Sequence, residues 1–442
     1  MIKLAAMDFY DISWQISSLL EGQDTVYLRT EPEIPDFTAR APFKMLLFSG
    51  AQRLEIEVNP DTVMWLGGLL GSTVFSKESV KVLYAWNLKA FNSYFRFFVS
   101  KFITPSNSII DLKVIESFLG IKKNRPENLT EVINRARIAL QRPSWKRLYK
   151  SIHMPLALRV LPDIETTPLL NTQSRKAEYP FYEIEGQING RMNCSKGYAY
   201  SYLPHNLGPV ERRSLKPRGY NLLFMTADFR HCEVTVLQWL TGDEDLGSIL
   251  ISGQDLHNKI YEVITEDPCD TAGKRVISKK MFLPVMYGLG PNQLARNLAV
   301  TPDLGIELHQ RIQRKFSTSY QKMLELQQRA RTEAIEDYFG RSRRFPEDKT
   351  YGARNFWVQG VAATACQEKL IKLHEVLGEL DANIAFSVHD GYCFCFRRPM
   401  AKEVYRVVKE TLESESQLCP GLRMKVEIKF GASLDEMKVL WK

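Results

Sequence analysis

The chain lacks the features that would place it in a membrane or outside the cell. No apolar run approaches the roughly 20 residues that a membrane-spanning helix needs. The first residues, MIKLAAMDFYD, contain no basic region followed by an apolar stretch and a cleavage site, which argues against secretion and organellar import. The 7 cysteines show no paired CxxC spacing, so we expect reduced thiols and no zinc site. Cys393 and Cys395 alternate along an expected strand, which favours core packing over metal binding.

The composition is that of an ordinary globular protein. Hydrophobic residues make up 44% of the chain and charged residues 25%. A length of 442 residues exceeds the usual size of one core, so we expect two or more domains. The formal net charge of +8 favours a polyanionic partner, although many basic proteins bind no nucleic acid.

Three regions differ in their sequence patterns. Residues 1 to about 125 alternate strand-like apolar runs, at 44–49, 54–58 and 80–84, with helical patterns, which is typical of an α/β domain. Residues 126–175 are basic and rich in proline, which predicts a connector with little core of its own, whose short helical stretches are interrupted at Pro143, Pro155, Pro162 and Pro168. From residue 176 onward the chain is globular, without linkers, repeats or low-complexity segments.

Two aspartates follow apolar runs in the third region. Asp228 ends the run at 221–227, and a carboxylate at the end of a buried strand lies at the lip of a sheet, where a metal ion can reach it. Asp390 follows a similar run, and His389-Asp390-Gly391 predicts a hairpin turn because Asp-Gly is a strong hairpin signal. The alternative for Asp390 is that it forms a turn and has no chemical role.

A helical stripe of cationic and aromatic residues lies between the two aspartates. Steps of four place four side chains on one slowly turning face: Arg275, Lys279, Leu283 and Tyr287. The two cations suit a triphosphate, whereas the simpler alternative is a solvated basic face anchored by Tyr287. Pro284 predicts a kink or break of this helix near Lys280. The order of all these elements indicates a nucleotide-polymerising site, because two carboxylates can hold two cations that clamp an in-line phosphoryl displacement.

At these residues the sequence resembles the family A DNA polymerases, the bacterial DNA polymerase I group, and especially their phage-encoded members. Three segments resemble motifs A, B and C of the family: Asp228-x4-Glu233, Arg275-x3-Lys279-x7-Tyr287-Gly288 and Val388-His389-Asp390. Other segments resemble the TGR, (D/E)IH, GRRR and NxxxQG segments and the closing strand: Asn189-Gly190-Arg191, Asp255-Leu256-His257, residues 339–344, Asn355-x3-Gln359-Gly360 and Val426-Glu427. The resemblance is collinear over about residues 185–440.

The resemblance implies a role for each matched residue. Asp228 and Asp390, with the backbone carbonyl of Phe229, would bind two Mg²⁺ ions, for which Mn²⁺ is expected to substitute. Arg275, Lys279 and His257 would hold the triphosphate. Tyr287 would flank the nascent base pair, and Glu233 would crowd the 2′ position of the sugar. The residues that would contact the minor groove or backbone of the primer-template end are Arg191, Asn355, Gln359 and His389.

Some positions depart from the family pattern. Leu283 stands where the family usually has Phe or Tyr under the incoming sugar, which affects the expected sugar discrimination and use of dideoxynucleotides. Gly391 replaces the usual Glu after the motif C aspartate, where we expect activity to survive. His231 and Thr235 replace the usual Gln and Arg of motif A. The chain is therefore expected to be a divergent enzyme.

The resemblance also implies a multidomain fold of α/β and α+β parts. Residues 1–125 would be a 3′-5′ exonuclease-like domain of RNase H-like fold, 126–175 a reduced thumb, and 176–442 a right-hand polymerase with an antiparallel-sheet palm and helical fingers at about 246–350. The exonuclease site is expected to be degenerate. The Asp-x-Glu motif is absent at Leu4 to Tyr10, Asn92 stands at the second acidic position, and only Asp111 persists. The short thumb leads us to expect weak processivity or a partner such as a processivity factor or a helicase.

Three functions are compared. The first is template-directed DNA synthesis from dNTPs on a primer-template, without proofreading, in the cytoplasm of a bacterium or a phage-infected cell. The second is a single-subunit RNA polymerase, which shares the palm and a similar motif B; Glu233 and the absence of a large promoter-binding region argue against it. The third is a nucleic-acid-binding relative without activity, against which the retention of Asp228 and Asp390, with Arg275 and Lys279, argues.

Overall fold

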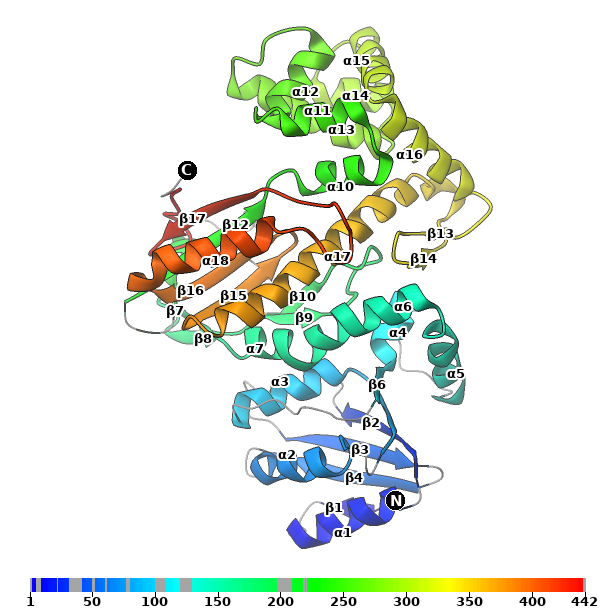
Figure 1. The fold of residues 1–442 in the computed structure, drawn as a ribbon, viewed down its shortest axis with the longest axis vertical. Coiled ribbons are helices and arrows are strands. Elements are labelled where there is room, and N and C mark those ends of the chain that lie inside the picture. The colour runs from blue at the N-terminus through cyan, green and yellow to red at the C-terminus, as the bar shows by residue number, and fades with distance from the viewer. Residues whose placement is uncertain are drawn as a thin grey trace.

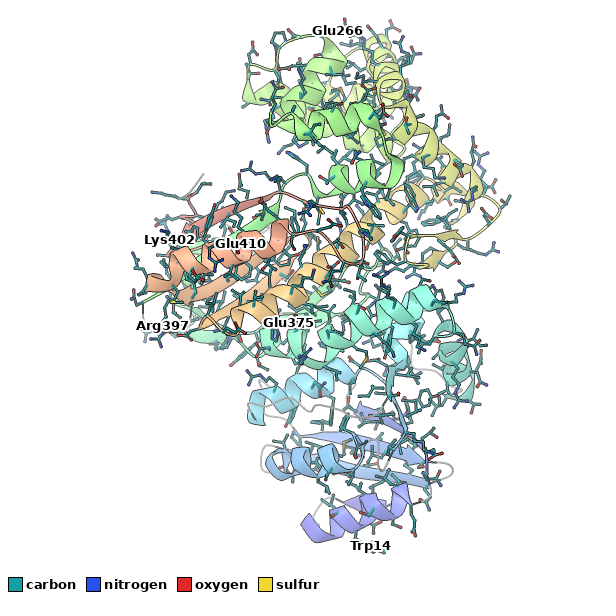
Figure 2. All side chains as sticks on the ribbon, in the orientation of Figure 1. Trp14, Glu266, Glu375, Arg397, Lys402 and Glu410 are labelled. Atoms are coloured by element: carbon teal, nitrogen blue, oxygen red, sulfur yellow. The ribbon has the colours of Figure 1, made fainter. Side chains whose placement is uncertain are left out.

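The computed structural model describes residues 2–4, 9–21, 23–31, 42–49, 52–59, 62–76, 80–99, 108–119, 129–196, 209–217, 219 and 221–439. Figure 1 shows an N-terminal sheet at one end of the molecule, a group of helices at the other end, and a second sheet between them. In Figure 2, Trp14 and Glu266 mark these two ends. Among the described residues, no helix has both the length and the apolar character needed to cross a membrane.

The N-terminal part contains a mixed sheet of six strands in the order β1-β4-β3-β2-β5-β6. Strands β2, β3 and β4 pair antiparallel, β1 runs parallel to β4, and β5 runs parallel to both β2 and β6. The strands predicted at 44–49, 54–58 and 80–84 are confirmed as β3, β4 and β5. The bounds are β1 Ile2–Leu4, β2 Thr25–Glu31, β3 Phe43–Ser49, β4 Gln52–Val58, β5 Val82–Ala85 and β6 Ser108–Asp111.

Helices cover this sheet and complete a core of its own. They are α1 Phe9–Leu20, α2 Val63–Ser72, α3 Leu88–Val99 and α4 Leu112–Phe118. Leu47 and Ile56 of the sheet are fully buried with Leu66 of α2 and Phe91 of α3. A second, larger cluster of buried residues extends over the other described parts of the chain, and it also contains Tyr27 and Tyr84 of this sheet and Leu112 and Ile115 of α4. Most of the sheet and helices α1 to α3 therefore share a hydrophobic core of their own, whereas α4 packs into the larger one.

The connector is more regular than its prolines predict. After α5 (Leu129–Ala139), residues 143–165 are helical throughout, as α6 Pro143–Leu148, π-helical η1 Tyr149–His153, π-helical η2 Leu156–Val160 and α7 Leu161–Glu165. The predicted interruptions at Pro155 and Pro162 are wrong. A π turn precedes each of these prolines, and its wider hydrogen-bond pattern accommodates a residue that has no N–H donor. Pro143 and Pro168 lie at the start and beyond the end of the helical run, as predicted.

The connector also contributes more to the interior than its sequence suggests. Leu148, Ile152, Leu156 and Ile164 are almost completely buried, and they belong to the larger core. At the start of α6, Trp145 donates from its indole N–H to the carbonyl of Gly340, 2.6 Å away. The connector is thus packed against the rest of the chain along its length.

The central sheet has four antiparallel strands in the order β15-β16-β12-β17. Helices α17 and α18 pack against each other and along this sheet, and α10 packs against α17 (Figure 1). Cys393 and Cys395 of β16 are buried, which confirms the core packing predicted for them. The bounds are β12 Leu222–Phe229, β15 Ala382–Val388, β16 Gly391–Arg397, β17 Val426–Gly431, α10 Cys232–Thr241, α17 Gly352–Leu377 and α18 Ala401–Glu413.

Short elements lie beside the central sheet. Strands β7 Leu169–Asn171, β8 Lys176–Glu178 and β11 Leu215–Pro217 form one small sheet, and β9 Phe181–Glu183 pairs with β10 Asn193–Lys196. The remaining short elements are α9 Pro209–Ser214 and the 3₁₀ turns η3 Glu347–Lys349 and η4 Arg398–Met400.

The other end of the molecule is helical. Side-chain caps fix where several of its helices begin, since Asp243, Asp255, Thr271 and Thr301 each accept a hydrogen bond from a backbone N–H of the first turn. The elements are α11 Glu244–Ile251, α12 Leu256–Thr265, α13 Ala272–Met286, α14 Pro291–Leu298, α15 Pro302–Lys315, α16 Ser317–Arg329, β13 Ile335–Glu336 and β14 Ser342–Arg343.

Candidate active site

The two distant aspartates lie at neighbouring strand ends. Asp228 is the penultimate residue of β12 and lies opposite Gly391, the first residue of β16. Asp390 is in the two-residue turn between β15 and β16, and the backbone N–H of Phe229 donates to its carbonyl at 3.2 Å. The predicted hairpin is confirmed, but its turn consists of His389-Asp390, with His389 left-handed at φ 54°. The antiparallel pairing of β12 with β16 therefore brings the two carboxylates to one edge of the sheet.

Burial perturbs both carboxylates, and repulsion by Asp390 adds to the effect on Asp228. Partial burial, together with the neighbouring Asp390, raises the pKa of Asp228 to about 6, against the opposing effect of Lys429. Burial also raises the pKa of Asp390. Within the described residues, the Asp228 carboxylate has no hydrogen bond and no ion pair within 4.0 Å. Two neighbouring carboxylates whose charged forms are disfavoured by burial are a donor set that fits a hard divalent cation.

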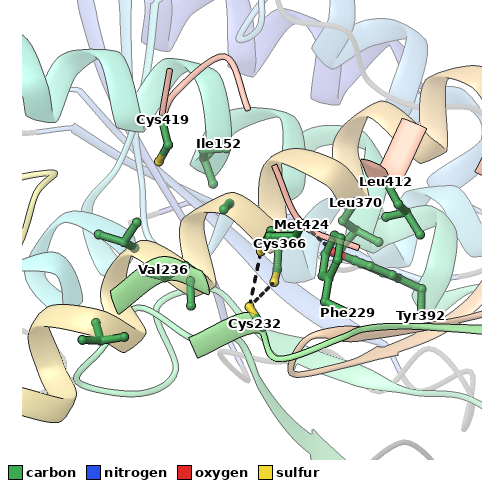
Figure 3. Packing of buried hydrophobic residues seen from close by; sticks show 14 of the residues in the cluster. Ile152, Phe229, Cys232, Val236, Cys366, Leu370, Tyr392, Leu412, Cys419 and Met424 are labelled. Carbon is green, nitrogen blue, oxygen red and sulfur yellow. Dashed lines mark hydrogen bonds between the residues drawn. The ribbon is translucent and has the colours of Figure 1, made fainter. Parts of the chain in front are cut away.

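The backbone beside the two aspartates is held by aromatic packing. The ring of Phe229 meets the ring of Tyr392 edge-on, with centroids 6.0 Å apart. The hydroxyl of Tyr392 donates to the carbonyl of Cys366 on α17, 2.8 Å away. Figure 3 shows these rings in the core next to Cys232, whose sulfur contacts those of Cys366 and Met424. The ends of β12 and β16 are therefore fixed to α17.

A second cluster gathers around Glu233 in the first turn of α10. Its carboxylate accepts from the guanidinium of Arg191 at 2.6 Å, from the hydroxyl of Tyr287, and from the amide of Gln359 at 3.1 Å. Asn189 in turn donates to the amide oxygen of Gln359 at 2.8 Å. Residues predicted from four separate segments of the sequence thus meet at one carboxylate, which is held from three sides.

The cationic stripe lies on α13 with histidines beside it. Arg275 forms a bidentate ion pair with Asp255, at 2.8 and 3.0 Å, and Asp255 also caps α12. Burial would raise the pKa of Asp255, but the hydrogen bonds from Arg275 and the Asn258 N–H, together with the charge of Arg275, lower it to about 2. Lys279 is exposed one turn further along and has no carboxylate within 4.0 Å in the described chain. His257 contacts His231, with ring centroids 5.1 Å apart, and burial lowers its pKa to about 4.

The sequence did not assign a role to Asp255, although it lies in the segment that contains His257. Its position two residues before His257 at the start of a helix is the signal that could have identified it as a capping residue. The contact between His231 and His257 was also missed, because it depends on the tertiary arrangement of α10 and α12.

The sequence predicts a kink or a break of the motif B helix near Lys280, and the break is wrong. Helix α13 is continuous from Ala272 to Met286 with Pro284 inside it. Pro284 lies in the last turn, so few hydrogen bonds are affected, and the burial of Met281, Phe282 and Val285 holds the helix in place. Leu283 is partly buried against the core, and Tyr287 follows the last helical residue.

The residues predicted to contact DNA lie at the start of α17, in the β15–β16 turn and beside a small cavity. Asn355 and Gln359 are one turn apart at the start of α17, and His389 is exposed in the β15–β16 turn. Arg191 and His389 line a cavity of about 130 Å³ together with Gln367 of α17, which donates to the carbonyl of Gly190 at 2.8 Å. The motif A residue Glu233 and the motif B residue Tyr287 are in direct contact, whereas Asp228 and Asp390 lie at the neighbouring ends of β12 and the β15–β16 turn.

The N-terminal candidates are arranged differently. Asp111 caps α4, is 1% exposed, and accepts hydrogen bonds from the backbone N–H groups of Asn87, Leu88, Lys113 and Val114. Asn92 is buried in α3 and donates toward the carbonyl of Ala157. The segment 5–8, where an acidic motif was sought, lies outside the described residues. In the part of the chain that is described, no group of three or more His, Cys, Asp or Glu forms a metal-binding cluster.

Comparison with known proteins identifies the family. The model of DNA polymerase family A matches residues 205–436, more than half of the chain. The chain therefore belongs to DNA polymerase family A. The thermostable DNA polymerase I of Thermus aquaticus is 28% identical over 236 residues, which cover 50% of this chain and 28% of that protein. DNA polymerase I of Geobacillus stearothermophilus is 26% identical over 244 residues, covering 51% and 27%.

A solved structure has the same fold over nearly the whole chain. The POL domain of Pol1 from M. smegmatis, in complex with DNA primer-template and dNTP, matches with a TM-score of 0.77 and 13% identity. The match covers 98% of this chain and 99% of that chain. The chain spans about a third or less of the length of the curated relatives described above.

Proposed function

We propose that the chain extends a DNA primer along a template by nucleotidyl transfer from dNTPs. The observation that carries this proposal is the convergence of Asp228 and Asp390 at adjacent strand ends, next to the Glu233 cluster and the cationic face of α13. Membership of DNA polymerase family A and the likeness to a POL domain solved with primer-template and dNTP support it.

The carboxylates of Asp228 and Asp390, with the carbonyl of Phe229, are proposed to hold two Mg²⁺ or Mn²⁺ ions. When bound, such ions stabilise the charges on the attacking and leaving oxygens of a phosphoryl transfer. The raised pKa of Asp228 supports this assignment, because a cation between two repelling carboxylates relieves the repulsion.

The nucleotide is proposed to bind between α13 and the Glu233 cluster. Lys279 and His257 would contact the triphosphate directly, and Arg275 would do so while Asp255 holds its guanidinium in place. Glu233 would exclude a 2′-hydroxyl, since its carboxylate is fixed by Arg191, Tyr287 and Gln359. Leu283 and Tyr287 would pack against the sugar and the nascent base pair.

The primer-template end is proposed to lie along the start of α17. Arg191, Asn355, Gln359 and His389 present polar groups around the same cavity or the same helix face. Hydrogen-bond acceptors in the minor groove are alike for all base pairs, so donors placed here would grip any sequence. That property suits an enzyme that copies a template.

Primer extension with each dNTP, NTP and ddNTP, with Mg²⁺ and with Mn²⁺, tests the proposal. Template-directed addition of dNTPs in strong preference to NTPs is the expected result. Preferential use of NTPs would identify an RNA polymerase, and duplex binding without extension under any condition would identify a relative without activity.

We propose that the domains are 1–125, 126–175 and 176–442, with fingers at about 246–350, and that the first is an exonuclease-like unit without hydrolytic activity. Asp111 supports this proposal. Its buried carboxylate accepts hydrogen bonds from four backbone N–H groups, so it already has a structural role. A labelled mismatched primer incubated with Mg²⁺ and no dNTP should keep its length, and shortening by the purified protein would refute this part.

The connector at 126–175 is proposed to act as a short thumb, as in a divergent enzyme of phage type. Fewer residues are available to wrap the duplex, so each binding event should add few nucleotides unless a processivity factor or a helicase assists. Extension in the presence of a primer trap measures this directly. Short products from the chain alone are expected, and long products would contradict the proposal.

A further inference from the structure

The strand that leads to Asp390 has an edge that no other strand covers. Strand β15 pairs only with β16 among the described strands, so its outer edge has unpaired backbone groups. At Ser387 the hydroxyl of Tyr182 replaces the absent neighbour. It accepts from the Ser387 N–H at 2.9 Å and donates to the Ser387 carbonyl at 2.9 Å. Tyr182 is 2% exposed, so water does not compete for these bonds.

The other end of Tyr182 is fixed by a buried ion pair. Its backbone N–H donates to Glu165 at 2.7 Å, and the same carboxylate oxygen accepts from Lys89 at 2.6 Å. Glu165 is fully buried and also accepts from the hydroxyl of Ser93. Lys89 and Ser93 belong to α3 of the N-terminal unit, whereas Glu165 ends α7 of the connector.

These contacts form one continuous path between the N-terminal unit and strand β15 of the central sheet. It runs from α3 to Glu165, along Tyr182 of β9, and to Ser387, three residues before Asp390. A buried ion pair is rigid because separating its partners leaves an uncompensated charge. The path therefore restrains the backbone that carries Asp390 from the side opposite β12.

We propose that Tyr182 is a positioning residue for Asp390, and that the N-terminal unit supports the polymerase site through Glu165. The proposal rests on the proposed function in one respect, since its kinetic consequence is seen in DNA synthesis. The unit that resembles a nuclease thereby serves the polymerising site as part of its framework. Tyr182 touches neither nucleotide nor metal in this account; it acts through the position of the β15–β16 turn.

The test compares Tyr182→Phe with a matched control in the same chain. Tyr149 has the same arrangement at another sheet edge: its buried hydroxyl accepts from the Asp111 N–H at 2.6 Å and faces the carbonyl of Ile109 at 3.4 Å. Tyr149→Phe therefore removes the same atom and the same kind of bonds, but far along the chain from Asp390. Both variants should lose similar stability, because each removes one buried hydroxyl.

Single-turnover extension and hydrogen exchange give the two readouts. Tyr182→Phe should lower the rate of nucleotide addition about tenfold, as expected for the loss of about one buried hydrogen-bonding group, with unchanged KM for dNTP and unchanged duplex affinity. It should also speed exchange at the Ser387 amide. Tyr149→Phe should leave the rate and the Ser387 amide as in the unsubstituted protein.

The outcomes separate this inference from the proposed function. Failure of the unsubstituted protein to extend a primer would overturn the proposed function, and the Ser387 amide would still test the bond to Tyr182. If the protein extends a primer, the inference would be overturned by a Tyr182→Phe variant that adds nucleotides at the unsubstituted rate. An equal loss of rate in Tyr149→Phe would overturn it too, as would an unchanged exchange rate of the Ser387 amide in Tyr182→Phe.

Discussion

The carboxylate of Asp228 occupies the space that a Cβ atom on Gly391 would fill. A Cβ built on Gly391 would collide with Oδ1 of Asp228 and would lie 3.3 Å from its Cγ. The two residues are direct partners in the pairing of β12 with β16. The small residue after the motif C aspartate therefore fits the position of the motif A aspartate in this chain.

Gly391→Ala should reduce DNA synthesis strongly because the methyl group displaces the Asp228 carboxylate. A displacement of about 1 Å at a reacting group can lower a rate on the order of 100-fold. Gly391→Glu, which introduces the residue usual in the family, should be no better than Gly391→Ala. Gly378→Ala is the control, since its Cβ would meet only ordinary contacts at 3.7 and 3.8 Å. The measurement is the steady-state kcat of DNA synthesis for each variant. Full activity in Gly391→Ala would contradict the packing argument.

Asp228→Asn should stabilise the metal-free protein at high pH. The pKa of Asp228 is raised to about 6, so its charged form is disfavoured in the folded state and its penalty is largest above pH 6. The penalty shrinks as the pH falls through 6 toward the ordinary value. In EDTA at pH 8 we expect a gain of about 1 kcal/mol in the free energy of unfolding, after allowance for solvent screening. The gain should be smaller at pH 5.

Urea unfolding at the two pH values measures this effect. Asp348→Asn, which removes an exposed carboxylate, serves as the control. A loss of stability in Asp228→Asn at pH 8, or a gain that is the same at both pH values, would show that the carboxylate is not held under repulsion.

Lys279→Ala should chiefly weaken the use of dNTP. A charged hydrogen bond to a phosphate contributes about 1.5 to 3 kcal/mol, so KM for dNTP should rise about 10- to 100-fold. Lys280 is the matched control, because it is exposed on the same helix and points about 100° away. The dependence of rate on dNTP concentration should be nearly unchanged in Lys280→Ala. Equal KM values in both variants would remove Lys279 from the triphosphate site.

Glu233→Ala should raise the incorporation of ribonucleotides. The carboxylate is fixed by Arg191, Tyr287 and Gln359, so its removal takes away a group that is held in one place. We expect the ratio of kcat/KM for NTP to that for dNTP to rise about tenfold or more. Glu244→Ala, at an exposed position of α11, should leave the ratio unchanged. No rise in Glu233→Ala would mean that another residue selects the sugar.

The sequence was most informative about residues that belong to motifs with a fixed spacing and a fixed order along the chain. Asp228, Glu233, Arg275, Lys279 and Asp390 could be proposed as site residues because each belongs to a segment of fixed spacing. The antiparallel pairing of β12 with β16 brings Asp228 and Asp390 to neighbouring strand ends. Strand β3 could be predicted because its buried residues form a largely apolar run, and β4 because Leu54, Ile56 and Val58 alternate with Glu.

Other features depend on contacts that no local pattern reveals. A rule based on local sequence predicts that Pro155 and Pro162 interrupt a helix. In the packed connector, the π turns before them accommodate both prolines. The role of Gly391 as a strand residue opposite Asp228 needed the register of β12 and β16, and the path through Tyr182 needed the positions of three separate segments. Asp111 could be recognised from the sequence as the one acid that persists in a degenerate site, but its position as the N-cap of α4 could not.

The most direct test of the account is Asp390→Ala, measured by single-turnover primer extension and by duplex binding on the same preparation. The account predicts that synthesis is abolished while duplex affinity stays close to that of the unsubstituted protein, because the role proposed for Asp390 is at the reacting phosphate and other residues are proposed to hold the duplex. Extension at the unsubstituted rate would contradict the assignment of Asp228 and Asp390 as the pair at which nucleotides are joined.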